Sequence, residues 1–542
     1  MINKPIIYQL FPRLFANYNE TRKRYGTKEE NGCGRFVDIN ERALKSISDL
    51  GVTHVWYTGV IRHATAEYNH PAITKGMAGS PYAITDYYDV DPDLAKNPKK
   101  RMEEFEALVA RTHEAGLGVL IDFVPNHVSR EYKSLCKPAG VEDLGEKDHP
   151  EWAFSPLNNF YYLPGEKFTM DMDLQGYEEY PAKVTGNDCF TSHPSTNDWY
   201  ETVKLNYGID YCDAGGKSEH FSPIPKTWGM MTDILLFWAK KGVDAFRCDM
   251  AEMVPAAFWF WATDKVKYRY PDIKFIGEVY NPGLYRNYIG AGFDWLYDKV
   301  GMYDCIRDIT CGHRRAGDIT RQWQATDDIR DHMLYFLENH DEQRIASDFF
   351  AGDGFKGIPG LIVSCLLQKN PFMLYAGQEF GERGMEQEGF SGKDGRTTIF
   401  DYWSVESIRC GYFDRRKMQK SEKELSALYR KIMKIARREK AVSKGATFDL
   451  MYVNQSIADK QYVFLRKAED ELLLVAVNFD GAEANISVAI PRHAFEYMGI
   501  PEREVTATDL LTKEQLKTVL IADASVRMTI PAYSGRIYKI KC

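Results

Sequence analysis

Four acidic residues stand at or just after the ends of short apolar segments that have the character of β-strands. They are Asp122 in LIDFVPNH, Asp249 in VDAFRCD, Glu278 in FIGE and Asp341 in LENHD. Taken alone, each acid is best explained as a helix cap or a solvated strand-end residue. Four acids at matched positions favour a shared reactive site, because carboxylates serve enzymes as acids, bases and nucleophiles.

Spacing assigns different roles to two of these acids. Arg247 lies two residues before Asp249, so both side chains point to the same face of a strand. A guanidinium keeps a neighbouring carboxylate ionised, as a nucleophile requires. Glu278 ends an apolar segment near other carboxylates, which suits a proton donor at neutral pH. We therefore expect a retaining pair ~5–5.5 Å apart, with Asp249 attacking a sugar and Glu278 as acid/base.

Further side chains follow the same strand ends. Asp341 is the candidate for a third carboxylate that holds sugar hydroxyls and stabilises an oxocarbenium-like transition state. His127 and His340 would donate hydrogen bonds to the same ring, although a structural histidine is the alternative for each. Cys248 adjoins Asp249 but should point away from it, because side chains alternate along a strand.

Positioning these acids requires one fold in which strand ends meet. Eight apolar segments alternate with amphipathic helical segments, at 6–11, 52–57, 117–124, 243–249, 273–278, 293–297, 333–338 and 372–376. This alternation predicts an α/β chain with a (β/α)8 TIM barrel, whose active site lies at the C-terminal ends of the strands. By this count the acids follow the third, fourth, fifth and seventh strands.

The rest of the chain divides around that barrel. A chain of 542 residues exceeds a single core, which stops growing near ~250–300 residues. We predict a catalytic barrel from 1–127 and 221–440 and an inserted subdomain at 128–220, after strand three, since ordinary loops are far shorter. Strand-like alternation after residue 441 predicts a C-terminal antiparallel β-sandwich at 441–542.

Composition narrows the function classes. The net charge of −8 argues against nucleic acid as a partner, which needs a basic surface. No segment has the length of a secretion signal or a membrane helix, so no membrane partner is expected. The ten cysteines include no C-x-x-C pair, which argues against zinc, and they indicate a reduced cytoplasmic protein.

The stretches DFVPNH (122–127), FRCD (246–249), GE (277–278) and NHD (339–341) resemble the signatures of glycoside hydrolase family 13, the α-amylase family. IIYQLFPRLF near the start and MLYAGQEFG on the eighth strand resemble it too. The resemblance implies Asp249 as nucleophile, Glu278 as acid/base and Asp341 as transition-state stabiliser. It also implies Arg247, His127 and His340 in the first subsite, with Tyr82 stacking under the cleaved sugar.

Finer features resemble the neopullulanase, cyclomaltodextrinase and maltogenic amylase group. Lys204 lies in ETVKLNYG, and Glu252, in DMAEMVPAAFW, stands where an acceptor-side contact is expected. Arg396, in the loop after strand eight, is a candidate for contact with the terminal sugar, with a simple exposed arginine as the equal alternative. Those enzymes usually carry an extra N-terminal β-domain, whereas here the first barrel strand begins at once.

The resemblance implies α-1,4, and by extension α-1,6, glucosidic bonds of maltodextrins as substrate, with no cofactor for the chemistry. A glucan transferase or isomerase of the same fold is one alternative, and a catalytically silent binding subunit is another. Asn126 matches a position that binds structural calcium in many α-amylases. A plain hydrogen-bonding role is the other interpretation, because calcium needs six or more oxygen ligands and no others are identified.

Overall fold

The computed structural model describes residues 4–542, so the first three residues of the predicted barrel domain lie outside the described residues. Within this range eight parallel strands close into a barrel in the order β1-β16-β15-β14-β13-β12-β5-β2. The strands are β1 Ile6–Leu10, β2 His54–Tyr57, β5 Gly118–Phe123, β12 Ala245–Cys248, β13 Lys274–Gly277, β14 Trp295–Tyr297, β15 Met333–Phe336 and β16 Phe372–Tyr375. The predicted fold class is confirmed, with each of the eight predicted segments supplying a strand.

These strands consist mainly of apolar residues and are buried on both faces. Every residue of β12, β15 and β16 is buried, as expected for parallel strands covered by helices outside and by side-chain layers inside. One register matters for the site: β12 pairs with β5 so that Arg247 lies opposite Asp122. Arg247 also lies opposite Ile276 of β13. Arg247 therefore lies on the middle one of three adjacent strands, β5, β12 and β13, which carry or directly precede three of the four acids.

The covering helices follow from periodicity and caps. Asn40 caps α3 (Glu41–Asp49) by accepting a hydrogen bond from the backbone of Ala43. The other main helices of the barrel are α4 Arg101–Glu114, α5 Lys226–Lys240, α6 Ala256–Arg269, α8 Asp304–Thr310, α9 Ile319–Ala325, α10 Ile358–Leu366 and α12 Lys420–Arg438. Buried apolar residues of α12, such as Leu425, Ile432 and Met433, lie on one face at helical spacing.

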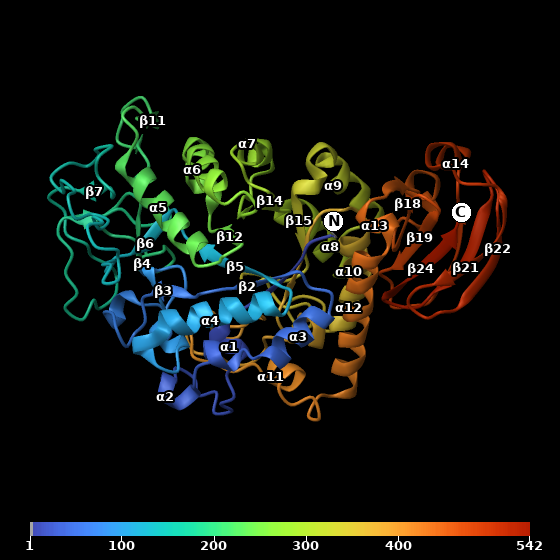
Figure 1. Ribbon diagram of the computed structural model, residues 1–542, viewed down its shortest axis with the longest axis horizontal. Coiled ribbons are helices and arrows are strands. Elements are labelled where there is room, and N and C mark those ends of the chain that lie inside the picture. The colour runs from blue at the N-terminus through green and yellow to red at the C-terminus, as the bar shows by residue number, and fades with distance from the viewer. Residues whose placement is uncertain (1–3) are drawn as a thin grey trace.

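A long irregular segment leaves the barrel after β5 and returns at α5. It contains β6 His127–Ser129, β7 Tyr162–Leu163, β8 Ala182–Lys183, β9 Thr202–Lys204, β10 Ile209–Asp210 and β11 Ser218–Glu219. β6 pairs with β9 in antiparallel register, with His127 opposite Lys204. This pairing ties the far end of the segment to the mouth of the barrel, and Figure 1 shows the segment on the side away from the C-terminus.

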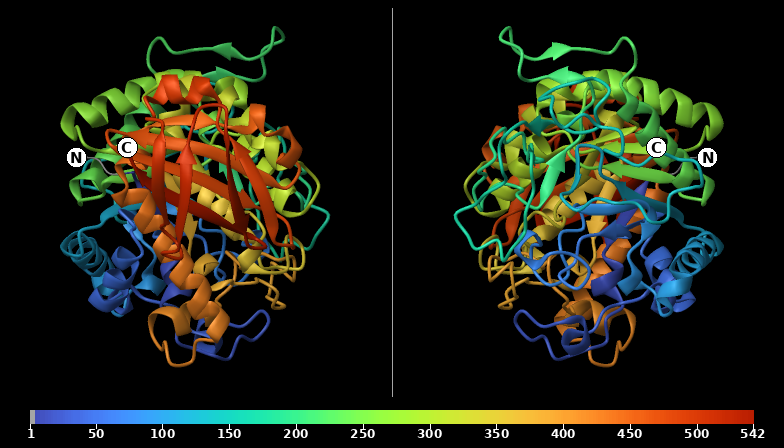
Figure 2. Two further views of the ribbon diagram at one scale, coloured as in Figure 1. Left: turned by 90° about the vertical axis from the view of Figure 1, so that its right-hand side faces the viewer. Right: turned by 90° about the vertical axis from the view of Figure 1, so that its left-hand side faces the viewer.

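The C-terminal part forms two antiparallel sheets. Six strands lie in the order β17-β18-β19-β24-β21-β22, and β20 pairs with β23. Their bounds are β17 Ala446–Asp449, β18 Gln461–Ala468, β19 Glu471–Asn478, β20 Ala484–Ala489, β21 Arg503–Asp509, β22 Gln515–Leu520, β23 Ser525–Ile530 and β24 Ser534–Lys541. Figure 1 shows these strands at one side of the barrel, and the left view of Figure 2 shows the same side facing the viewer. Among residues 4–542, none of the helices combines the length and apolar character that crossing a bilayer requires.

Candidate active site

A single buried guanidinium gathers three acids at the C-terminal ends of the strands. Arg247 Nη1 lies 2.7 Å from Asp249 Oδ1 and Nη2 lies 2.7 Å from Glu278 Oε2. Nη1 also lies 3.5 Å from Asp122 Oδ1. Because one planar group contacts both Asp249 and Glu278, the two carboxylates lie side by side at one rim. The separation of ~5–5.5 Å that a retaining pair needs stays a prediction.

Strand hydrogen bonds fix the backbone under these two acids. The amide of Asp249 donates to Phe123 O at 2.9 Å, and the amide of Glu278 donates to Cys248 O at 3.1 Å. These bonds continue the barrel ladder by one residue beyond the strands. Gly277 precedes Glu278, and a Cβ built there would lie 2.7 Å from Leu296 Cδ2, so this position requires the close approach that glycine permits.

Glu278 is held at both carboxylate oxygens. Oε2 accepts a hydrogen bond from the backbone of Met250 at 2.8 Å, and Oε1 accepts one from the Tyr280 hydroxyl at 2.5 Å. Met250 adopts a left-handed conformation with φ of 41°, which is uncommon for a non-glycine residue. That turn aims its amide at Glu278 directly after Asp249, so the backbone links the two acids.

A second hydrogen-bond network joins Asp341, His340 and Tyr82. His340 is fully engaged: Nδ1 lies 2.8 Å from Gln9 Nε2, and Nε2 lies 3.2 Å from Asp341 Oδ2 and close to the Tyr82 hydroxyl. Asn339 Oδ1 accepts hydrogen bonds from the amides of Asp341 and the following residue at 2.9 Å. His340 therefore positions Tyr82 and Asp341 from behind the cavity wall.

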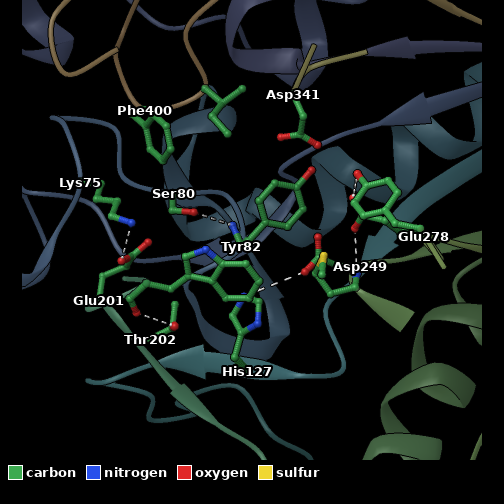
Figure 3. Close-up of a pocket in the computed structure, with 14 residues that line it drawn as sticks. Lys75, Ser80, Tyr82, His127, Glu201, Thr202, Asp249, Glu278, Asp341 and Phe400 are labelled. Carbon is green, nitrogen blue, oxygen red and sulfur yellow. Dashed lines mark hydrogen bonds and ion pairs between the residues drawn. The ribbon is translucent and has the colours of Figure 1, made fainter. Parts of the chain in front are cut away.

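These groups surround one cavity of about 290 Å³. Asp249, Glu278, Asp341, Tyr82 and His127 all line it, together with Lys75, Ser80, Trp199, Glu201, Thr202, Met250, Tyr280, Ile399 and Phe400. Figure 3 shows Tyr82 between Asp341 and His127, with Asp249 and Glu278 on one side of it. The predicted nucleophile, acid/base and third carboxylate thus share one cavity.

Burial and crowding of like charges raise the pKa values of the acids. Burial raises the pKa of Asp249 well above its ordinary range, and Glu278 and Asp122 add to the rise while Arg247 opposes it. Burial, with Glu278, raises the pKa of Asp341 to about 7. Burial raises that of Asp122 to about 6. Arg247 alone therefore does not hold the pKa of Asp249 at an ordinary carboxylate value, contrary to the expectation from their spacing in the sequence, because burial outweighs the pairing.

Seven predicted site residues do not line the cavity, namely Arg247, His340, Asp122, Glu252, Arg396, Lys204 and Asn126. The buried Asp122 carboxylate accepts a hydrogen bond from Trp56 Nε1 at 3.0 Å and faces Arg247. Glu252 accepts from the amide of Asn281 at 3.0 Å. The side chain of Arg396 is exposed and pairs with Asp394 at 3.6 Å, although its charge lowers the pKa of Asp341. Sugar contact by these residues stays a prediction.

The match to a known protein family covers the first part of the barrel and the inserted segment. The catalytic-domain model of the alpha-amylase family matches residues 9–282, just over half of the 542-residue chain. The chain belongs to the alpha-amylase family. It is an alpha-amylase-type glycosidase by that membership, and Asp249 and Glu278, just after β12 and β13, stay its predicted carboxylate pair.

Relatives of this alpha-amylase-family chain have low sequence identity to it, but the matches extend over most of the chain. It is 24% identical over 498 residues to Alpha-amylase 3 of Dictyoglomus thermophilum, covering 88% of this chain and 85% of that one. It is 22% identical over 550 residues to Neopullulanase 2 of Thermoactinomyces vulgaris, covering 98% and 77%. Among solved structures, a maltogenic alpha-amylase from Thermotoga neapolitana matches with a TM-score of 0.65, 20% identity and 99% of both chains covered.

The calcium position of the family is filled differently in this chain. Lys204 Nζ donates to Asn126 Oδ1 at 2.8 Å and lies 2.5 Å from Asp188 Oδ1. Asn126 Nδ2 donates to Gly186 O at 2.7 Å. The side-chain oxygens that could bind a cation therefore already face an ammonium group buried among them. These residues do not fit a calcium ion, which needs six or more oxygen ligands with no cation between them.

Several residues in or behind the cavity wall were not predicted from the sequence. Tyr280 carries the hydroxyl that contacts Glu278, and Gln9 contacts His340. Lys75 and Glu201 lie at the far end of the cavity, where they form an ion pair. Tyr280 follows a predicted catalytic acid by two residues, so strand alternation was a usable signal. No comparable signal marked Lys75, which comes from a loop without periodicity.

Proposed function

We propose that this protein is a retaining hydrolase of α-glucosidic bonds in maltodextrins. Glu278 gives its proton to the glycosidic oxygen while Asp249 attacks the anomeric carbon, so the C–O bond to the leaving sugar breaks as the bond to Asp249 forms. Glu278 then removes a proton from water, which attacks the same carbon and frees Asp249. The observation that carries the proposal is Arg247 holding both carboxylates at one cavity.

The remaining groups support that sequence of steps. Tyr82 offers a ring face for the cleaved sugar, since flat aromatic surfaces suit sugar faces. Asp341 and His127 face the same cavity and are positioned to contact hydroxyls and to stabilise positive charge at the anomeric centre. Cys248 is buried in the barrel wall, which supports a packing role for it.

The test is a product profile on maltoheptaose, cyclodextrin and pullulan. We expect shortened maltodextrins whose new reducing ends appear first as the α-anomer, followed by NMR. Asp249→Asn should abolish these products while circular dichroism stays unchanged. β-anomers as the first products would overturn the retaining mechanism, and sugar binding without turnover by the wild type would favour a silent binding subunit.

Transfer of the glycosyl group to a sugar is the second candidate. It is supported by an Alpha-1,4-glucan:maltose-1-phosphate maltosyltransferase of Cereibacter sphaeroides, 25% identical over 330 residues and covering 57% of this chain. The same covalent intermediate serves both reactions, and only the second acceptor differs. Adding a labelled acceptor sugar separates them, since a transferase converts most of the label into longer products.

We infer that Lys204 serves as the built-in cation at Asn126 in place of calcium. The ammonium group contacts Asn126 and Asp188 and thereby links β9 to the end of β5. We expect the melting temperature to be the same in excess calcium and in a chelator. A fall of several degrees on chelation would contradict this. Lys204→Met should destabilise the protein, because two oxygens lose their partner.

We also propose a reducing compartment such as the cytoplasm. The ten cysteines of the chain are all free, and four of them, Cys248, Cys305, Cys365 and Cys410, are buried. Free thiols in this number are typical of reduced surroundings. Cell fractionation tests the proposal.

A further inference from the structure

The two ends of the catalytic cavity differ in chemistry. Glu278, Tyr280 and Met250 lie at one end, and Lys75, Glu201 and Phe400 lie at the other. Figure 3 shows Tyr82 between them, with Glu278 on one side and the Lys75–Glu201 pair on the opposite side. Because Glu278 must reach the glycosidic oxygen, the leaving sugar lies at its end. The non-reducing side of the cleaved glucose therefore points toward Lys75 and Glu201.

An ion pair spans that far end. Lys75 Nζ lies 3.0 Å from Glu201 Oε2, with side-chain exposures of only 12% and 5%. The same ammonium donates to Asp198 O at 3.4 Å and lies 5.1 Å from the centre of the Tyr200 ring. Lys75 belongs to the loop between β3 (Ile61–His63) and β4 (Ile84–Val90), whereas Glu201 belongs to the inserted segment. The pair thus joins two parts of the chain across the end of the cavity.

Buried contacts hold this closure in place. The amide of Arg130 donates to Glu201 O at 3.0 Å, and its guanidinium contacts the Tyr200 carbonyl, Glu179 at 2.8 Å and Thr185 at 2.7 Å. Nearby, the Trp199 ring packs on His127 at 5.1 Å between centroids. The wall is therefore built from anchored groups and does not depend on a free loop tip.

The cavity is also small. Its volume of about 290 Å³ lies at the lower limit of ligand sites, which span ~300–1,000 Å³. A chain that continued past the cleaved sugar on its non-reducing side would have to displace the anchored pair. The free hydroxyls of a terminal glucose, in contrast, match a cation and a carboxylate that can donate to and accept from them.

Resting on the proposed function, we propose that the Lys75–Glu201 pair makes this enzyme exo-acting. The pair ends the donor side at one sugar and binds the terminal hydroxyls of the glucose at the non-reducing end. The enzyme then releases single glucose units from short α-glucans and does not cut within a chain.

The first test uses the wild-type protein and two maltoheptaosides, one free and one with its terminal 4- and 6-hydroxyls blocked. We expect glucose as the first product from the free substrate and at least 100-fold slower cleavage of the blocked one. Comparable rates on both would overturn exo action while leaving the hydrolase proposal intact. No turnover of either maltoheptaoside or of 4-nitrophenyl α-glucoside would instead overturn the proposed function itself.

The second test opens the wall with Lys75→Ala and Glu201→Ala, singly and together. We expect the double variant to cleave the blocked maltoheptaoside at least 10-fold faster than the wild type and to release maltose as well as glucose. The matched control is Lys167→Ala with Glu178→Ala, which removes an exposed pair of the same inserted segment, 2.7 Å apart. An unchanged product pattern in a folded double variant, as judged by circular dichroism, would overturn the role of the pair.

Discussion

Two buried arginines of the barrel, Arg247 and Arg344, differ in the charge of the side chains around them. Arg247 on β12 faces three carboxylates, with Asp341 adding a fourth acid to the same cavity. Arg344, after β15, pairs with Glu338 at 3.0 Å and otherwise donates to neutral oxygens of Thr397 and Ala376, both at 3.0 Å.

The comparison separates a reactive cluster from a structural pair. Around Arg344 one positive charge meets one negative charge, and the remaining contacts satisfy hydrogen bonds. Around Arg247 there are more acids than the one guanidinium can pair. This excess is unfavourable for folding, but raised carboxyl pKa values are typical of functional sites. Burial alone does not distinguish the two sites, because it also raises the pKa of Glu338 to about 7. The difference lies in the number of acids for each guanidinium.

The largest expected effect is a loss of activity when an acid of the Arg247 cluster is replaced. Asp249→Asn should lower kcat on maltoheptaose by ~10⁴-fold or more, as found for residues that act as a catalytic unit. Because the change also removes one surplus charge, the free energy of unfolding at pH 7.5 should not fall. Steady-state kinetics and urea denaturation measure the two quantities, with exposed Asp272→Asn as the control. Activity above one-tenth of wild type would break the assignment.

The second prediction concerns the balanced ion pair of Arg344 with Glu338. Arg344→Met should lower the free energy of unfolding by ~3–5 kcal/mol, because it leaves Glu338 buried without its charge partner. The double variant with Glu338→Gln should regain part of that loss. The exposed pair of Arg286 with Asp328, 2.6 Å apart, is the control, and Arg286→Met should cost only ~0–1 kcal/mol. Equal losses at both arginines would contradict a matched buried pair.

The burial of Asp122 in this cluster also predicts a pH effect on stability. Because the folded-state pKa of Asp122 is raised to about 6 from 3.8, its protonation stabilises the fold fully below pH 3.8. That contribution is lost as pH rises through 6. Asp122→Asn does not titrate, so its stability relative to wild type should increase by up to ~3 kcal/mol between pH 4 and pH 8. Denaturation curves at both pH values measure this, and a difference that stays constant would refute it.

The smallest effect concerns one hydrogen bond inside the cluster. Tyr280→Phe removes the hydroxyl that donates to Glu278 at 2.5 Å. Since a hydrogen bond to a charged group contributes ~1.5–3 kcal/mol, kcat/KM should fall by roughly 10- to 150-fold. Tyr268→Phe, on an exposed face, should leave the rate unchanged. A Tyr280→Phe enzyme as active as wild type would remove the tyrosine from the mechanism.

Much of this architecture was predictable from the sequence because strand position determines it. Apolar segments ending in Asp249 and Glu278 indicate both the barrel and the rim where the acids meet, since parallel strands in a barrel end on one side. The same reasoning placed Asp341 and His127 beside the cavity.

Loop chemistry was not predictable in the same way. Lys75 and Glu201 are 126 residues apart in sequence, and neither lies in a periodic segment that would fix its direction. The contact of Lys204 with Asn126 depends on the pairing of β6 with β9, and short strands in an irregular segment give little sequence signal. Likewise, the engagement of both His340 nitrogens needed coordinates, because hydrogen-bond partners come from distant parts of the chain.

The extension of the strand ladder beneath the catalytic pair has a consequence for variation among related proteins. The amides of Asp249 and Glu278 bond to Phe123 and Cys248, so the frame that aligns the two acids is the barrel wall itself. Loops around the mouth of the barrel can therefore differ in length or in side chains without changing the relative position of the two acids. The same pair of acids can thereby serve substrate entrances of different shape, each built from loop residues.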